Sequence, residues 1–184
     1  MGLTISYLII GIYSIALLLI FFYSLSQLNL LLNYLGQRRK QKEAPKFNLM
    51  DPREIPYVTI QLPIYNEKYV VERLLDNIAL LEYPKSKLEI QVLDDSTDDS
   101  VDQTASIIAE LQKTGLDIQH IRRENREGFK AGALKEGLKI AKGEFIAIFD
   151  ADFLPDSDWL KKTVPYFKDE EIGVVQTRWG HINR

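Results

Sequence analysis

Two aspartates, Asp150 and Asp152, directly follow the apolar run Phe145–Phe149. Burying a charge is costly unless the charge is paired or bound to a metal ion. In an extended chain, residues two apart point to the same side, and two carboxylates facing one point repel each other unless a cation joins them. An isolated Asp-x-Asp also occurs in acidic turns and helix caps, but its place after an apolar strand favours a metal site. Carboxylate oxygens suit Mg²⁺ or Mn²⁺, so we predict that these two aspartates bind one such ion.

Three further polar clusters stand where predicted strands end: "PIYNE" at 63–67, "DDSTDD" at 94–99 and "RENREGFKAGA" at 123–133. In the first cluster, Tyr65 has a ring that can stack on a nucleobase, although a core tyrosine is an equal alternative. In parallel sheets, ligands bind outside the carboxyl ends of the strands. The four clusters are therefore expected to meet at one edge of a sheet.

The second and third clusters each hold a candidate ligand-binding side chain. Either Asp94 or Asp95, at the end of a strand, can accept a hydrogen bond from the edge of a base. Lys130 lies between two glycines, an arrangement that suits phosphate or ribose contact with a close backbone approach, and its alternative is a surface lysine at a helix start. The segment is not a P-loop, which requires Gly-Lys-Ser or Gly-Lys-Thr.

The elements that must position these residues alternate along the chain from residue 57. Alternating strands and helices predict an α/β fold, a Rossmann-like, mostly parallel sheet with helices on both faces. The continuous apolar run at 145–149 predicts a strand that is buried on both faces. The expected strands are 57–62, 88–93, 116–121, 145–149 and 172–179, and the expected helices are 70–83, 100–115, 129–143 and 156–167.

The first 37 residues contain no Asp, Glu, Lys or Arg. This stretch exceeds the roughly 20 apolar residues that cross a bilayer, and it lacks the basic start and small-residue cleavage site of a signal peptide. We predict one transmembrane anchor at 1–36, a juxtamembrane basic segment and linker at 37–56, and the domain proper at 57–184. The basic residues Arg38, Arg39, Lys40 and Lys42 predict that the domain is cytoplasmic.

Composition narrows the possible partners. The 184 residues carry a formal net charge of -3 with no long basic stripe, so nucleic-acid binding is not expected. The chain has no cysteine, which fits a domain without a disulfide framework.

Five segments, "QLPIYNE", "IQVLDDSTDDS", "NREGFKAGALKEGL", "AIFDADFLP" and "VVQTRW", occur in order and with compatible spacing. Together they resemble the family-2 processive glycosyltransferases, especially the branch of cellulose-synthase-like glucomannan and mannan synthases. The resemblance covers roughly residues 57–184. It implies a GT-A fold and an inverting, metal-dependent transfer of a hexose from a UDP- or GDP-linked donor to a growing β-glycan or another acceptor. A glycan or lipid acceptor and a plasma, inner or Golgi-type membrane are the further partners it implies.

The resemblance also implies roles for single residues. The general base belongs to a Thr-Glu-Asp-like segment, and no match follows Asp158. We therefore expect the base beyond Arg184, in a chain truncated at its C-terminus and inactive alone. Asp169, Glu170 and Glu171 have the context of a solvated turn. The implied ligand-binding residues are Pro63, Tyr65 and Glu67 in the nucleoside-binding loop, Asp95 at the base, Lys130 at the nucleoside or diphosphate, and Asp150 and Asp152 as the metal-binding Asp-x-Asp, with Asp152 the more direct ligand.

Two alternatives remain open at this point. One is a module that binds a nucleotide sugar without catalysis, which the absent base favours. The other is a receiver-like regulatory domain, which also combines acidic residues, Mg²⁺ and a lysine. A receiver needs its acidic pair after the first strand, whereas the first predicted strand here ends in "PIYNE".

Overall fold

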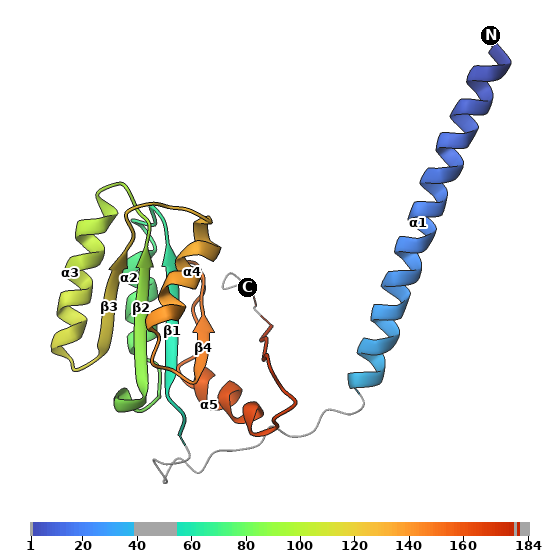
Figure 1. The fold of residues 1–184 in the computed structure, drawn as a ribbon. Helices are drawn as coiled ribbons and strands as arrows, with labels where there is room; N and C mark the ends of the chain where they lie inside the picture. Colours follow the sequence, from blue (N-terminus) through green and yellow to red (C-terminus); the bar gives the residue numbers. More distant parts are fainter. Residues whose placement is uncertain (1, 39–54, 179, 181–184) are drawn as a thin grey trace. The chain divides into compact units, whose positions relative to one another are not determined.

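The computed structural model describes residues 2–38, 55–178 and 180 (Figure 1). The chain divides into two compact units, residues 1–43 and 44–184. Arg39, Lys40, Lys42 and most of the predicted linker lie outside the described residues, as do Trp179 and Arg184. The predicted boundaries at 36 and 56 therefore stay predictions.

The first unit contains the helix α1, Gly2–Arg38. Its segment Leu3–Gly36 has 34 residues, and the most apolar stretch of 18 residues within it has a mean hydropathy of 2.5 and is not buried within the protein. At 1.5 Å per residue this segment is about 50 Å long, more than the roughly 30 Å of a bilayer core. By length and composition, α1 is a candidate membrane span.

The second unit is built on a four-stranded sheet in the order β3-β2-β1-β4. Every pairing is parallel, as the alternating pattern predicts, and β1 is central with β2 and β4 as neighbours. The strands are β1 Val58–Ile64, β2 Leu88–Asp94, β3 Asp117–Arg122 and β4 Phe145–Ile148, and the crossover helices are α2 Val71–Ala79, α3 Ser100–Lys113 and α4 Phe129–Ile140, with a short 3₁₀ turn η1 at Lys85–Lys87.

The two faces of this sheet differ in chemistry. On one face, apolar residues of β1 and β2 such as Ile60 and Ile90 form the core with Leu74 of α2 and Ile108 of α3. The apolar stripes of α2 and α3 are thus buried against the sheet, which is the main source of their stability. In Figure 1, α4 crosses the opposite face, in front of β1 and β2.

The face under α4 carries buried polar side chains. Glu89 is fully buried, and its carboxylate accepts hydrogen bonds from Thr59 Oγ1 at 2.6 Å, the Lys142 backbone N–H at 2.9 Å and Gln119 Nε2 at 3.2 Å. These bonds compensate the cost of burying the charge. A Cβ built at Gly137 would lie 2.7 Å from Gln61 Nε2, so glycine lets α4 approach the sheet closely without displacing that side chain. This packing fixes the axis of α4, and with it the turn that precedes it.

Two strand predictions are wrong. The run at 145–149 is not buried on both faces, because among the described residues β4 is an edge strand that pairs with β1 alone. Ala147 and Phe149 are buried, but Ile148 is 47% exposed. The predicted strand at 172–179 does not form over the described residues 172–178, where no neighbouring strand offers a ladder, and Val174 is 83% exposed. A strand needs a hydrogen-bonding partner, which an apolar pattern alone does not supply.

The predicted helix at 156–167 is shorter and composite. An α-helix, α5 Trp159–Thr163, passes into the 3₁₀ helix η2 Val164–Lys168. Pro165 explains the change, because proline lacks the N–H of an α-helical hydrogen bond and its ring collides with the preceding turn.

Candidate functional site

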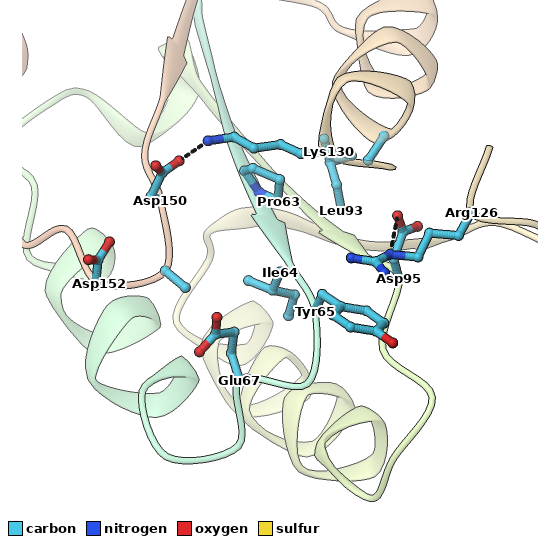
Figure 2. A pocket seen from close by; sticks show the side chains of 12 residues that line it. Pro63, Ile64, Tyr65, Glu67, Leu93, Asp95, Arg126, Lys130, Asp150 and Asp152 are labelled. Atoms are coloured by element: carbon cyan, nitrogen blue, oxygen red, sulfur yellow. Dashed lines mark hydrogen bonds and ion pairs between the residues drawn. The ribbon is translucent and has the colours of Figure 1, made fainter. Parts of the chain in front are cut away.

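A cavity of about 510 Å³ opens at the carboxyl ends of β1, β2 and β4 (Figure 2). All seven binding residues implied by the sequence line it, together with Arg126 from the turn before α4. The expectation that four clusters meet at one sheet edge is confirmed by this cavity. The lining residues are Pro63, Ile64, Tyr65, Glu67, Leu93, Asp95, Arg126, Lys130, Ala133, Asp150, Ala151 and Asp152.

The loops after β1 and β2 are tied to each other, and this positions Tyr65. Asn66 has a φ of 56°, a left-handed conformation that asparagine tolerates better than most residues. Its N–H donates to Ser96 Oγ at 2.8 Å, and its side-chain oxygen accepts the Thr97 N–H at 2.9 Å. The Asp95 N–H donates to the Ile64 carbonyl at 3.1 Å. Tyr65 is thereby held 38% exposed at the cavity wall.

The structure distinguishes the adjacent acids Asp94 and Asp95. Asp94 is 1% exposed and does not line the cavity; its carboxylate contacts His120 Nε2 at 2.7 Å and accepts a hydrogen bond from the Ser96 N–H at 2.8 Å. Burial by itself raises the pKa of Asp94, but the hydrogen bonds from His120 and Ser96 outweigh it, and the net pKa is lowered. Asp94 is thus a structural anchor. Only Asp95 lines the cavity.

Arg123 pairs with Asp95 and shapes the turn before α4. Its Nε donates to Asp95 Oδ1 at 2.8 Å and its Nη2 donates to Oδ2, a two-pronged pair that raises the pKa of the guanidinium. The same guanidinium donates to the carbonyls of Glu127 at 2.8 Å and Phe129 at 3.1 Å. Gly132 makes this turn possible, because a Cβ there would lie 1.9 Å from the Glu127 carbonyl oxygen.

Arg126 is a cavity residue that the motif-by-motif interpretation missed. Its guanidinium carbon lies 3.3 Å above the centroid of the Tyr65 ring and 5.2 Å from that of Phe129, and its Nε lies 4.0 Å from Asp95 Oδ2 (Figure 2). Phe129 has a φ of 48°, so Asn66 and Phe129, the two non-glycine residues with positive φ among those described, both flank this cavity. Such conformations cluster at functional sites. The sequence signal for Arg126 was its place in "NREGFKAGA", but this did not distinguish it from its equally basic neighbours Arg122 and Arg123.

The Asp150–Asp152 segment is a turn and not an extended chain. The Phe153 N–H donates to the Asp150 carbonyl at 3.0 Å, so the prediction that the two side chains share a side because the chain is extended is wrong. Both nevertheless line the cavity. Figure 2 shows Asp150 paired with the ammonium of Lys130, while Asp152 lies farther along the turn and is exposed.

These residues fit a hard divalent cation in a limited way. Over the described ranges 2–38 and 55–178, no group of three His, Cys, Asp or Glu side chains converges as a complete metal site. Mg²⁺ typically takes one or two carboxylates and completes its shell with water and substrate phosphates, and two carboxylates at an open cavity match that pattern. The Lys130 ammonium beside Asp150 is the positive charge that such an ion would have to replace.

The sequence as a whole has recognisable relatives. The family model described as Glycosyl transferase family 2 matches residues 59–184, more than half of the chain. The chain belongs to glycosyl transferase family 2. Within this family it is similar to plant enzymes. It is 40% identical over 163 residues to glucomannan 4-beta-mannosyltransferase 1 of Cyamopsis tetragonoloba, covering 84% of this chain and 31% of the relative. It is 43% identical over 133 residues to glucomannan 4-beta-mannosyltransferase 1 of Oryza sativa subsp. japonica, covering 70% and 26%.

Solved structures of the family share the fold. The mannosyltransferase PcManGT from Pyrobaculum calidifontis, in complex with GDP-Man and Mn²⁺, superposes with a TM-score of 0.62 at 35% identity, covering 78% of this chain and 41% of the other. S. aureus TarS 1-349 gives 0.52 at 30% identity, covering 62% and 32%. The resemblance seen in the sequence and the GT-A-like fold are therefore confirmed. The chain spans less than a third of the length of the curated relatives that it matches.

Proposed function

We propose that this chain carries the nucleotide-sugar-binding part of a membrane-anchored, metal-dependent, inverting hexosyltransferase that extends a β-glycan. The observation that carries the proposal is the single cavity that collects an aromatic ring, a fixed carboxylate, two cationic side chains and two further carboxylates. Such a set matches the base, diphosphate and metal of a nucleotide sugar. Support also comes from the family and from relatives named as mannosyltransferases.

GDP-mannose is the donor that we place first, with UDP-hexoses second. PcManGT is described in complex with GDP-Man and Mn²⁺, and the plant relatives are named glucomannan 4-beta-mannosyltransferases. In the proposed complex the base stacks on Tyr65 and meets the Asp95–Arg123 pair. A planar ring with a hydrogen-bonding edge requires these two kinds of contact.

The diphosphate lies beside the cations of the turn and of α4. Lys130 and Arg126 reach the cavity from there, and both have the charge and the donors that bind phosphate oxygens. Asp150 and Asp152 would hold the divalent ion, with Pro63 and Glu67 in the wall of the nucleoside end. When bound, the ion supplies Lewis-acid neutralisation of the departing diphosphate.

The general base is not assigned to a residue of this cavity. Asp95 is held in a two-pronged ion pair with Arg123, and Asp150 and Asp152 are assigned to the metal ion in this proposal, so none of the three is free to remove a proton from an acceptor hydroxyl. Asp169, Glu170 and Glu171 are exposed residues in the turn after η2 and do not line the cavity. The proposal therefore assigns the nucleotide sugar and the metal ion to this cavity and leaves the base unassigned.

The membrane part of the proposal rests on α1. This helix would anchor the enzyme, and the basic residues that follow it would keep the domain on the cytoplasmic side of the membrane, where nucleotide sugars are available.

A module that binds a nucleotide sugar without turning it over is the second candidate, favoured by the two paired carboxylates. Transfer of labelled sugar from the donor to an oligosaccharide distinguishes the two.

The first test is calorimetry of the 184-residue chain in detergent with GDP-mannose and UDP-glucose, with and without Mn²⁺. We expect binding that depends on Mn²⁺ and that Asp152→Ala weakens at least about 10-fold, because the variant removes a ligand of the ion. The control is Asp156→Ala, which removes an exposed carboxylate four residues away and outside the cavity. Equal loss in both variants, full affinity of Asp152→Ala in Mn²⁺, or equal binding of the unaltered chain in Mn²⁺ and in EDTA would contradict the proposed site.

A further inference from the structure

The ammonium of Lys130 occupies the position that the divalent metal ion needs in the proposed reaction. Its ammonium, on the first turn of α4, pairs with the carboxylate of Asp150, one of the two aspartates of the proposed metal site. Within the described part of the chain, the structure shows no ion pair for Asp152. A divalent ion that approaches the ligand-free cavity thus meets one open carboxylate and one that is already neutralised.

The ion pair between Lys130 and Asp150 is weak enough for Lys130 to leave Asp150 for another anion. The two side chains are 52% and 43% exposed, and ion pairs with this degree of exposure are weak. The ammonium is a compact charge on a flexible four-carbon stem, so it can move between neighbouring anions without a change in the backbone. A diphosphate in the same cavity carries more negative charge than one carboxylate and attracts the ammonium more strongly.

The metal site itself needs oxygens from a ligand. The described residues offer no third acidic or histidine side chain converging on Asp150 and Asp152. Phosphate oxygens would complete the shell of the ion at the moment when they also draw the ammonium away. Binding of the diphosphate would therefore release Asp150 from Lys130 and, in the same step, supply the missing ligands of the metal ion.

We infer that Lys130 is a stand-in cation that neutralises Asp150 in the ligand-free chain and moves to the diphosphate when the nucleotide binds, which opens Asp150 to the metal ion. This inference rests on the proposed function and adds a binding order to it. The nucleotide enters first or together with the metal, and free metal binds weakly. The same segment places Arg126 over Tyr65, so it contacts both the Tyr65 side and the Asp150 side of the cavity.

The test is the affinity for Mn²⁺ without any nucleotide, read from the electron paramagnetic resonance signal of free Mn²⁺ with the full chain in detergent. The variant Lys130→Met removes the ammonium and keeps most of the stem, and Lys130→Gln repeats the change with a polar end. We expect both to bind Mn²⁺ about 3- to 10-fold more tightly than the unaltered chain, because a competing charge is gone. We expect both to bind GDP more weakly, because the same ammonium is lost to the diphosphate.

Lys135→Met is the matched control. Lys135 lies on the same helix, is exposed, and does not line the cavity, so the variant removes an equal charge without touching Asp150. A gain in Mn²⁺ affinity shared by Lys135→Met is a net-charge effect and overturns the inference, as does unchanged or weaker Mn²⁺ binding in the Lys130 variants. In those cases, intact binding of GDP and Mn²⁺ by the unaltered chain still supports the proposed function. An unaltered chain that binds neither, alone or together, overturns both, and one that binds GDP but takes up no Mn²⁺ even in the presence of GDP overturns the inference.

Discussion

Gly132 is the position where a single methyl group tests the geometry of the cavity most directly. In Gly132→Ala the new Cβ would lie 1.9 Å from the Glu127 carbonyl oxygen and 2.7 Å from Arg123 Nη1. The oxygen belongs to the backbone, so the turn must retreat by about 1.5 Å to reach ordinary contact distance. That movement pulls against the hydrogen bonds that Arg123 makes to this turn and to Asp95.

The expected change in the free energy of unfolding of Gly132→Ala is the balance of three contributions. Alanine is favoured over glycine inside a helix by about 1 kcal/mol. Overpacking costs about 1–3 kcal/mol, and the strained hydrogen bond from Arg123 to the Glu127 carbonyl adds about 0.5–1.5 kcal/mol. We expect a net loss of about 1–3 kcal/mol in the free energy of unfolding, seen as a Tm lowered by roughly 4–10 °C for a unit of this size.

The assay is thermal unfolding of the full chain followed by tryptophan fluorescence, with GDP binding measured on the same samples. GDP affinity should fall at least about 10-fold, because the displaced turn carries Arg126 and Lys130. Gly173→Ala is the control, since nothing lies within 4 Å of a Cβ built there. A Gly132→Ala variant that is as stable as the unaltered chain, or more stable by the helix-propensity term, would refute the packing described for this turn.

Two further predictions concern the loops after β1 and β2. Tyr65→Ala should weaken GDP binding by about 1–3 kcal/mol while Tyr65→Phe keeps it, because stacking needs the ring and not the hydroxyl. Calorimetry measures both affinities, and the control is Tyr69→Ala, which removes a 94% exposed tyrosine outside the cavity. An equal loss of GDP affinity in Tyr69→Ala would contradict the prediction. Asp94→Asn should destabilise the chain at neutral pH, because a pKa lowered by His120 and Ser96 means that the ionised form stabilises the fold. This stabilisation is present above pH 3.8, the ordinary pKa of aspartate, and is lost as the pH falls through the lower pKa of Asp94 in the folded chain. The unfolding curves of the variant and the unaltered chain should therefore converge at acidic pH. A stability difference that stays constant down to the most acidic pH would contradict the prediction.

The sequence was sufficient for the order and kind of most elements. Strands and helices alternate with distinct periodicities, and four parallel strands with three crossover helices formed close to the predicted ranges. The site clusters follow strand ends, and parallel strands bring such ends to one edge of a sheet whatever the details of packing. For this reason all seven implied residues, from Pro63 to Asp152, line one cavity.

The errors occurred where a local pattern has to be completed by a distant partner. The run at 145–149 is as apolar as a central strand, but the sheet order makes β4 an edge. The segment at 172–178 has strand-forming residues and no neighbour to pair with in the described structure. The turn at Asp150 depends on a hydrogen bond to Phe153, which residue spacing does not reveal.

By itself, the sequence determined the fold class, the family and the set of side chains that gather at the sheet edge, because periodicity and the placement of polar residues after strands are local properties. The residues by themselves left open which of two adjacent aspartates, Asp94 or Asp95, faces the cavity, although the resemblance named Asp95. Only the tertiary structure decided what binds Asp94, and that Arg126 covers Tyr65 while Lys130 neutralises Asp150. The physical reason is that these outcomes depend on the pairing register, on left-handed turns and on ion pairs between residues up to 28 positions apart.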